Sequence, residues 1–218
     1  NDQRLKDGDL VLIDAGGELE GYAADITRTY PVNGRFTPPQ RELYELVLAA
    51  QEAAIAKVVP GNRWIEPHEA AVKTLTRGLV ELGLLPGGRK AVPKLICDEA
   101  YKPYFMHRTG HWIGMDVHDC GSYVEPAEQS QTSERRDPLS GELIVDRPSR
   151  ILRAGMALTI EPGLYIRPAP SVPEAFHHLG IRIEDDAVVT QDGCELLTRG
   201  VPVQAGAIEA LMQEAASR

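Results

Sequence analysis

The stretch that decides the fold is LVLIDAGGELEGYAADITRTYPV, residues 10–32. Its first five residues alternate as a β-strand requires, with Asp14 on the same face as two leucines. Residues 15–17, Ala-Gly-Gly, interrupt this strand, and a second strand follows from Asp25 to Thr29. The stretch therefore predicts a β-hairpin in which an ionisable residue ends an otherwise apolar strand.

The rest of the chain alternates helical and extended patterns. Apolar residues recur every three to four positions in three stretches, which predict helices over residues 38–58, 67–82 and 205–216. Short apolar runs predict further strands around residues 157–166, 180–190 and 194–198. The order hairpin, helix, helix, strands, helix predicts an α+β fold.

Residues 122–150 differ from the rest because they are polar and contain prolines and much of the local charge. We interpret them as a surface insertion, with a hairpin through residues 139–145. The remainder is expected to form a single domain over residues 1–218, since this length can bury a sizeable core.

Composition and charge narrow the class of protein. Of the 218 residues, 43% are hydrophobic and 25% are charged, and the formal net charge is −9. An acidic chain with scattered basic residues is not expected to bind nucleic acid. No apolar run approaches the ~20 residues that span a bilayer, and the start, NDQRLKDGD, lacks the features of a signal peptide. We expect a cytoplasmic protein that binds neither membranes nor nucleic acid.

Four carboxylates stand where the strand patterns should bury them: Asp14, Asp25, Glu161 and Glu184. An isolated buried carboxylate is costly, so such groups need a cationic partner or a metal ion. Carboxylates with an imidazole form a ligand set suited to Mn²⁺, Zn²⁺ or similar divalent ions. Alternatively, these residues are strand-end acids at the surface or paired with arginine, and spacing alone leaves both interpretations open.

Three histidines, His107, His111 and His118, lie close together in HRTGHWIGMDVHD, residues 107–119. The first two have the i, i+4 spacing of a zinc-binding helix, but no glutamate follows His107, and Thr109-Gly110 is a poor helix former. An HExxH metalloprotease is therefore excluded, although the clustering still favours a site. The other histidines are interpreted as surface residues of helices or loops: His68, His177 and His178.

Other catalytic patterns are missing from the sequence. It has no GxSxG, no GxxxxGK[ST], and no GxGxxG after a strand. Cys120, two residues after His118, is a poor candidate nucleophile. We interpret the three cysteines as reduced core thiols: Cys97, Cys120 and Cys194.

Four blocks of sequence, taken together, carry a family resemblance. In chain order they are DAGGELEGYAADITRTYPVNGRFT, HRTGHWIGMDVHD, LTIEPGLYI and GIRIEDD. They resemble the signature blocks of the pita-bread metallopeptidases, and most closely those of the Xaa-Pro aminopeptidase (aminopeptidase P) branch. The spacing agrees with that family in three candidate pairs: Asp14 and Asp25 are eleven residues apart, His111 and His118 seven, and Glu161 and Glu184 twenty-three.

The resemblance implies a curved, mostly antiparallel sheet covered by helices, and a site for two divalent metal ions. Asp25 and Glu184 would bridge the two ions. Asp14 would complete the coordination of one ion, and His111 with Glu161 would complete that of the other. Manganese is the metal expected first, with zinc and cobalt as alternatives.

The resemblance also implies a part of the fold that this chain does not include. The family's catalytic domain begins before the first strand seen here, and another active-site histidine would fall a few residues upstream of Asn1. An N-terminal domain usually precedes it and often mediates assembly. We therefore expect a chain truncated at its N-terminus, from a protein that forms homo-oligomers through the missing region.

The same resemblance assigns roles around the metals. Glu161 would also act as general base and proton shuttle. His107 and His118 would contact substrate and stabilise the oxyanion of the tetrahedral species. Arg182 and Tyr165 would orient the ligating carboxylates. Their alternative interpretation is an ordinary salt bridge and a core tyrosine.

The activity implied is the release of the N-terminal residue from peptides whose second residue is proline. The nearest alternative is prolidase, which would use the same ligands on dipeptides. Methionine aminopeptidase matches the blocks less well, and the metal-free creatinase type is disfavoured because the metal ligands are retained. A different class, a non-catalytic binding module of the same fold, is disfavoured because all five metal ligands are retained.

Overall fold

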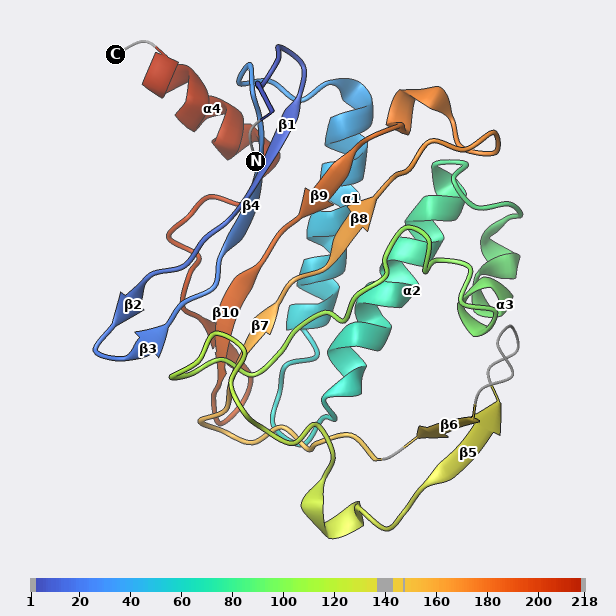
Figure 1. Ribbon diagram of the computed structural model, residues 1–218, viewed down its shortest axis with the longest axis vertical. Helices are drawn as coiled ribbons and strands as arrows, with labels where there is room; N and C mark the ends of the chain where they lie inside the picture. The colour runs from blue at the N-terminus through green and yellow to red at the C-terminus, as the bar shows by residue number, and fades with distance from the viewer. Residues whose placement is uncertain (1–2, 137–142, 147, 217–218) are drawn as a thin grey trace.

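The hairpin expected at residues 10–32 is the first element of the computed structural model, which describes residues 3–136, 143–146 and 148–216. Strands β1 (Leu10–Asp14) and β4 (Thr27–Pro31) pair antiparallel in a register that places Asp14 opposite Thr27. Between them, β2 (Glu18–Leu19) and β3 (Tyr22–Ala23) form a short ladder at the hairpin tip (Figure 1). The predicted hairpin is confirmed.

The second long strand begins at Thr27, whereas the sequence predicted that it would include Asp25. The backbone N–H of Asp25 donates to Asp186 Oδ2 at 3.0 Å and so leaves the ladder. Gly16 makes room for this departure, because a Cβ at that position would lie 1.5 Å from the carbonyl oxygen of Ala24. Asp25 is thereby held outside the regular strand.

Two long helices, α1 (Pro38–Ile55) and α2 (Ile65–Glu81), follow the hairpin. A capping box formed by Thr37 and Gln40, with proline in the first turn, starts α1 at the predicted residue. Turns at residues 56–57 end α1 before its predicted end at 58. The predicted start of α2 at 67 is two residues late, because the Arg63 N–H donates to Glu66 at 2.9 Å and extends the first turn.

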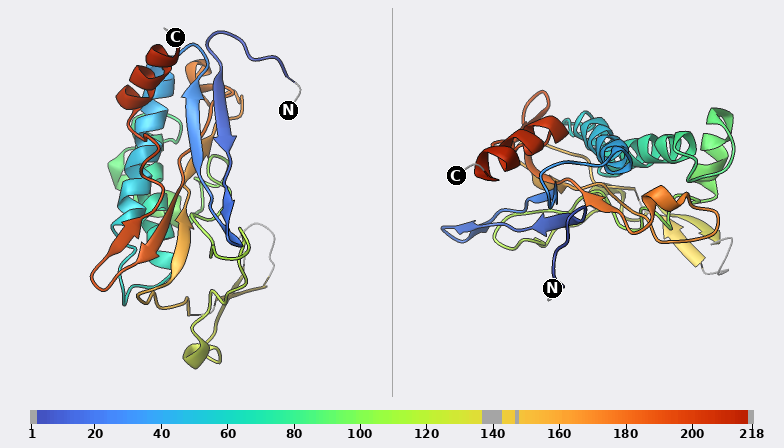
Figure 2. Two further views of the ribbon diagram at one scale, coloured as in Figure 1. Left: turned by 90° about the vertical axis from the view of Figure 1, so that its left-hand side faces the viewer. Right: turned by 90° about the horizontal axis from the view of Figure 1, so that it is seen from above.

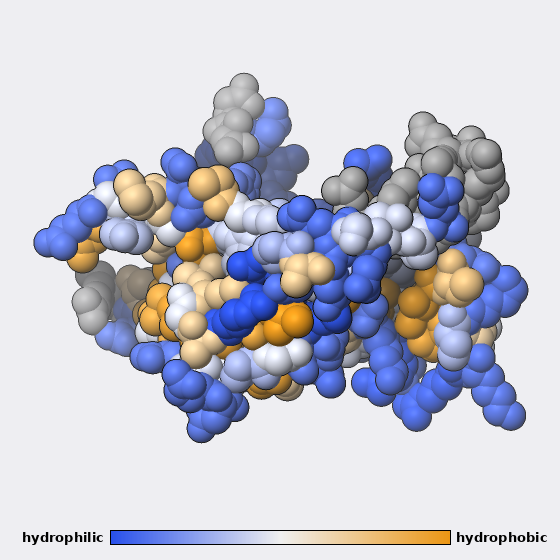
Figure 3. All heavy atoms as spheres, turned by 90° about the horizontal axis from the view of Figure 1, so that it is seen from below, coloured by the Kyte–Doolittle hydropathy of each residue, from blue (hydrophilic) through white to orange (hydrophobic). Residues whose placement is uncertain are grey.

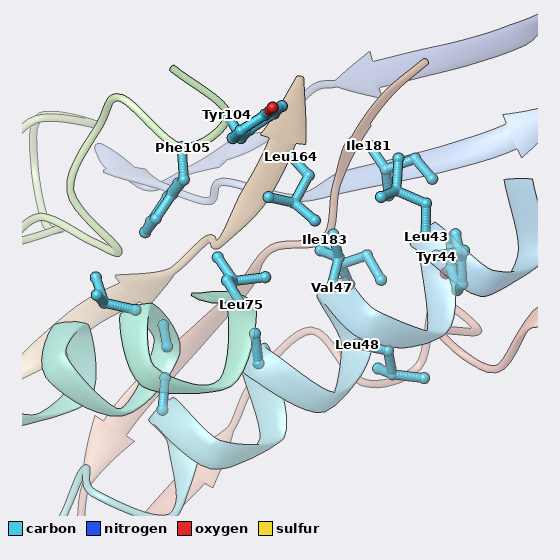
Figure 4. Close-up of a cluster of buried hydrophobic side chains, with 14 of the residues drawn as sticks. Leu43, Tyr44, Val47, Leu48, Leu75, Tyr104, Phe105, Leu164, Ile181 and Ile183 are labelled. Atoms are coloured by element: carbon cyan, nitrogen blue, oxygen red, sulfur yellow. The ribbon is translucent and has the colours of Figure 1, made fainter. Parts of the chain in front are cut away.

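The helices form one layer and the strands another (Figure 2). Helices α1 and α2 come close at Gly78, where a Cβ would lie 2.2 Å from Leu46 Cδ1. From α1, Leu43 and Val47 project toward the strand layer, where Ile181 meets them (Figure 4). All three of these core side chains have no exposed surface. Helices on one face of antiparallel strands confirm the predicted α+β class.

The strands after the helices fall into two groups. β10 lies between β7 and β11, antiparallel to both, and β8 pairs antiparallel with β9. Their bounds are β7 (Ala157–Ile160), β8 (Gly163–Tyr165), β9 (Gly180–Arg182), β10 (Asp185–Val189) and β11 (Cys194–Leu196).

Two predicted strands are each broken in the middle. The run 157–166 divides at Glu161, whose N–H donates to the Thr109 carbonyl at 2.8 Å, and the following proline has no N–H. The run 180–190 divides at Glu184, whose N–H donates to the Thr27 carbonyl at 3.0 Å. In both cases the backbone changes its hydrogen-bonding partner at an acidic residue.

The remaining elements are short or peripheral. Strands β5 (Ser133–Arg136) and β6 (Leu143–Asp146) pair antiparallel within the predicted insertion, while residues 137–142, where the turn of the predicted hairpin falls, lie outside the described residues. Helix α4 matches its predicted bounds. The helices are α3 (Val92–Cys97), α4 (Ala205–Ala216) and the 3₁₀ turns Arg89–Ala91, Pro126–Glu128 and Glu174–Phe176.

The surface carries two of the three cysteines. Cys97 and Cys120 are exposed, and Cys194 is half-buried, so the prediction of core thiols is wrong for the first two, which lie at a helix end and in a loop. Seen from below, hydrophilic surface surrounds separate apolar patches (Figure 3). No helix among the described residues is long and apolar enough to cross a bilayer.

A buried ion pair joins the hairpin to the later strands. The Arg28 guanidinium contacts Asp185 Oδ1 at 2.8 Å, and the two side chains are 2% and 0% exposed. From α1, Gln51 donates to the other oxygen of Asp185 at 2.9 Å. Thr198 donates to Oδ1 at 2.7 Å. Arg199 Nε also lies 3.1 Å from Asp185 Oδ2. Strand β4, strand β10 and helix α1 therefore share one polar network around the Asp185 carboxylate.

Replacing Arg28 with methionine is expected to lower the free energy of unfolding by about 3–5 kcal/mol, because Asp185 loses the closer of its two arginine partners and the carbonyls of Val201 and Pro202 lose their donor. Chemical denaturation of the two proteins measures this. The matched control is Arg89→Met, which breaks the exposed ion pair with Glu81 and should cost less than about 1 kcal/mol. Equal losses in the two variants would contradict the assigned importance of the buried pair.

Candidate metal centre

The breaks in the strands bring acidic residues together. Glu161 lies between β7 and β8, and Glu184 lies between β9 and β10. Asp25 precedes β4, and His111 reaches the same place from the loop that crosses β7. Ligand atoms of Asp25, His111 and Glu184 lie within 4.8 Å of one another. Residues separated by more than 150 positions thus form one cluster.

His111 is oriented by its neighbours. Its Nδ1 lies 3.0 Å from the Trp112 carbonyl oxygen and therefore carries the proton that it donates there. Its Nε2 then points to the carboxylates, at 3.3 Å from Asp25 Oδ2 and 3.7 Å from Glu161 Oε1. The hydroxyl of Thr159 accepts the backbone N–H of His111 at 3.2 Å. The imidazole is thus positioned as a ligand would be.

Asp14 differs from its prediction. The strand pattern predicted a buried carboxylate, but its side chain is 46% exposed and forms an ion pair with Arg182. The reason is its position at the end of β1, where the chain turns into the exposed hairpin. Asp14 therefore lies at the edge of the cluster, in contact with Arg182.

A chain of hydrogen bonds leads from Arg182 to the cluster. Arg182 donates to the Tyr165 hydroxyl at 3.0 Å, and that hydroxyl lies 2.9 Å from His107 Nε2. Arg182 also donates to Thr27 Oγ1 at 3.2 Å, and Thr27 in turn donates to Glu184. Arg182 therefore contacts two side chains that each approach the cluster, in addition to Asp14.

His107 and His118 lie on the open side of the cluster. His107 Nδ1 is 4.0 Å from Glu161 Oε2, and its side chain is 29% exposed. His118 is exposed, and its ring meets His111 edge-on with 4.3 Å between centroids. The structure therefore brings all three histidines of the predicted motif to one place.

Sequence reasoning missed several residues of this region. The Thr27 hydroxyl donates to the Glu184 carboxylate, and the Thr159 hydroxyl accepts the backbone N–H of His111. The Asp186 carboxylate accepts the backbone N–H of Asp25. A signal was available for Asp186, because it is two residues after Glu184 and strand alternation places both on one face. The hydroxyl contacts carry no such signal, since they join segments far apart in the chain.

Burial and mutual repulsion change the protonation of the cluster. Burial, with added repulsion from Glu161, raises the pKa of Glu184 to about 8. Burial also raises the pKa of Glu161 to about 7. Although burial alone lowers the pKa of His111, its hydrogen bond to Asp25 raises that pKa to about 9. Without a metal, the cluster therefore retains protons near neutral pH.

The raised pKa values of the cluster indicate whether a divalent cation would fit there. A cation beside His111 Nε2 would replace the proton that now faces Asp25, and would remove the repulsion between Glu161 and Glu184. Three to four carboxylate groups with one imidazole are also the donor types that Mn²⁺ and Zn²⁺ accept. The residues of the cluster fit a divalent metal.

Comparison with known proteins now decides the family. The sequence pattern of the family described as metallopeptidase family M24 matches residues 1–191. The chain belongs to metallopeptidase family M24. This M24 chain is 46% identical to an Xaa-Pro aminopeptidase of Haemophilus influenzae over 212 residues, which are 97% of the chain and 44% of that relative.

Comparison with solved structures supports the family assignment. The M24 chain superposes on an aminopeptidase of Pseudomonas aeruginosa with a TM-score of 0.87 and 50% identity, covering 100% of the chain and 44% of that structure. For a zinc-substituted Escherichia coli aminopeptidase P in complex with product, the TM-score is 0.83 and the sequence identity is 46%. The match covers 98% of the chain and 43% of that structure. The pita-bread fold is confirmed, and the M24 chain spans under half the length of these relatives.

The metal-free M24 chain is expected to lose stability as the pH rises from 7 to 9. Glu161, Glu184 and His111 have folded-state pKa values raised to about 7, 8 and 9, so the folded chain holds protons that the unfolded chain has already released. Thermal melts of chelator-treated protein at both pH values measure this.

The variant Glu184→Gln provides the control for this pH dependence. The amide has no proton to lose, so the fall in melting temperature between pH 7 and pH 9 should be smaller than in the parent chain. A melting temperature that stays constant or rises over this range in the parent chain would contradict the proton retention.

Proposed function

We propose that this chain is the catalytic part of a dinuclear metal-dependent aminopeptidase that hydrolyses the N-terminal Xaa-Pro bond of peptides. The observation that carries the proposal is the convergence of Asp25, His111 and Glu184 within 4.8 Å, with Glu161 beside them, in a chain of family M24. The names of the relatives support the choice of aminopeptidase within the family.

Five residues would hold the two metal ions: Asp14, Asp25, His111, Glu161 and Glu184. Asp25 and Glu184, the two most buried carboxylates of the five, would be shared by both ions. Asp14 would serve one ion, and His111 with Glu161 the other. When bound, divalent ions polarise the scissile carbonyl and lower the pKa of water. We propose manganese as the metal, with zinc and cobalt as alternatives.

Glu161 would act as general base and proton shuttle. It stands between the buried cluster and the open side, with its carboxylate near both His111 and His107 and its side chain 19% exposed. A carboxylate in this position can accept a proton from water and deliver it to the leaving amine. The other carboxylates of the cluster are more deeply buried or held by Arg182.

His107 and His118 would contact the substrate. In His107, Nδ1 donates to the Arg108 carbonyl at 2.7 Å, so Nε2 accepts from the Tyr165 hydroxyl. Tyr165 and Arg182 thereby fix the ring, which makes them positioning residues. His118 is free to meet the substrate from the exposed side, where it can donate to a developing oxyanion.

A dedicated site for proline has a physical basis. The Xaa-Pro bond has no N–H and restricts the residue before it, so general peptidases accommodate it poorly. The free amine of the substrate would find an acidic partner in Asp14, whose carboxylate is exposed at the edge of the cluster. Both features favour release of one residue from the N-terminus.

The free cysteines and acidic charge of the chain suit the cytoplasm. We propose that residues 1–218 act as one catalytic domain with 122–150 as a surface insertion. Peptides would be its partners, with no role for nucleic acid or membranes. The part of the protein outside this chain would form the contacts of a homo-oligomer.

The variant Glu161→Gln should fold like the parent protein but lose at least about a hundredfold in kcat, since the amide cannot accept a proton. Release of the first residue from an Xaa-Pro-Xaa tripeptide measures kcat, and circular dichroism checks folding. The control Glu174→Gln changes an exposed glutamate of a distant 3₁₀ turn and should retain activity. Near-normal turnover in Glu161→Gln would exclude the proposed role.

The choice between aminopeptidase and prolidase is tested with two substrates. Manganese-loaded protein should cleave an Xaa-Pro-Xaa tripeptide as readily as an Xaa-Pro dipeptide, and should leave an Xaa-Ala-Xaa tripeptide largely intact. Activity confined to the dipeptide would identify a prolidase. Hydrolysis of neither proline peptide by metal-loaded, folded protein would favour the non-catalytic binding module.

A further inference from the structure

A cavity of about 670 Å³ lies beside the metal cluster without including it. Its walls come from the start of α2, the backbone at Thr109–Gly110, the segment at Tyr123–Val124 and strand β7. None of the five proposed metal ligands lines it. Its volume is in the range of sites for small organic molecules, about 300–1,000 Å³.

One side of the cavity is aromatic and aliphatic. Trp64 and Tyr123 lie with ring centroids 4.9 Å apart, and Trp112 packs on Trp64 at 4.1 Å. Leu158 and Ile160 complete the apolar wall from β7. Flat, rigid rings of this kind offer a large contact area to an apolar ligand at little cost in side-chain entropy.

The other end of the cavity is polar and positively charged. His68, which was interpreted from the sequence as a surface residue, is half-buried, because the start of α2 faces the loop at Thr109, whose hydroxyl lies 2.8 Å from His68 Nδ1. Burial, followed by the nearby basic side chains of Arg108, His107 and Lys102, lowers the pKa of His68 to about 4. The charges that act on this ring are therefore all basic.

Two polar groups at this end have no partner among the described residues. His68 Nε2 makes no hydrogen bond to any of them, and the exposed guanidinium of Arg108 forms no ion pair with a described carboxylate. The second arginine of the cavity, Arg63, is already neutralised by Glu128 at 3.0 Å. The unused positive charge is thus concentrated at one end of an otherwise apolar space.

We propose that this cavity is a binding site for a small organic carboxylate with an aromatic or aliphatic body. The carboxylate would accept from Arg108, and also from His68 in the tautomer whose Nε2 carries the proton while Nδ1 accepts from the Thr109 hydroxyl. The body of the ligand would lie along Trp64 and Tyr123. A positive group on the ligand would be disfavoured by the same basic residues. This site does not depend on the proposed peptidase activity, because none of the five proposed metal ligands lines the cavity.

The test compares 3-phenylpropanoate with its neutral analogue 3-phenyl-1-propanol by isothermal titration calorimetry on the complete protein. Wild type should bind the acid about tenfold more tightly than the alcohol, since a charge-assisted hydrogen bond to arginine contributes at least that factor. Arg108→Gln should remove this preference. Val124→Phe, which fills the cavity, should weaken both ligands.

Arg77→Gln is the matched control, because it removes an exposed arginine from α2 outside the cavity and should bind like wild type. Thermal melts confirm folding of each variant, and Arg108→Gln is at an exposed position where folding is expected to be retained. Equal binding of acid and alcohol by wild type would overturn the proposal. Unchanged acid binding in Arg108→Gln, or in folded Val124→Phe, would also overturn it, as would the absence of binding.

Discussion

The ion pair between Arg28 and Asp185 is the interaction on which the arrangement of this molecule depends. It joins β4 of the N-terminal hairpin to β10, and helix α1 adds Gln51 to the same carboxylate. With almost no exposed surface, either charge would be costly without the other. Because side chains alternate along a strand, sliding β4 by one residue would turn Arg28 to the wrong face and leave Asp185 without its main partner. One register is therefore strongly favoured.

That register also builds the metal centre. Thr27 and Glu184 each precede a member of the ion pair, so they project to the opposite side, where the Thr27 hydroxyl donates to the Glu184 carboxylate. The breaks in the strands at Glu161 and Glu184 also help to build the metal centre. The backbone N–H of Glu161 bonds to Thr109 and that of Glu184 bonds to Thr27, so each glutamate leaves its strand and turns toward the cluster. The like charges that result raise the pKa values of both glutamates, which is a cost that a divalent cation would relieve.

The loop that carries HRTGH serves two chemically different spaces. His107 and His111 face the carboxylates, whereas Thr109 contacts His68 at the end of the neighbouring cavity. Gly110 permits this arrangement, since a Cβ there would lie 2.1 Å from the carbonyl oxygen of Thr159 on β7. Close packing of loop on strand thus separates a hard, oxygen-rich site from an apolar cavity with a basic end.

The sequence by itself determined the hairpin, the long helices and the family of this protein. The helices, the hairpin and the four motif blocks follow from local periodicity and from residue types at set spacings, which need no knowledge of distant contacts. Only the tertiary structure decided that Asp14 is exposed and paired with Arg182, that His68 contacts Thr109 beside a cavity, and that Thr27, Thr159 and Asp186 support the cluster. Burial and hydrogen bonding of this kind depend on segments more than 40 residues apart, and a local pattern carries no information about which of them will meet.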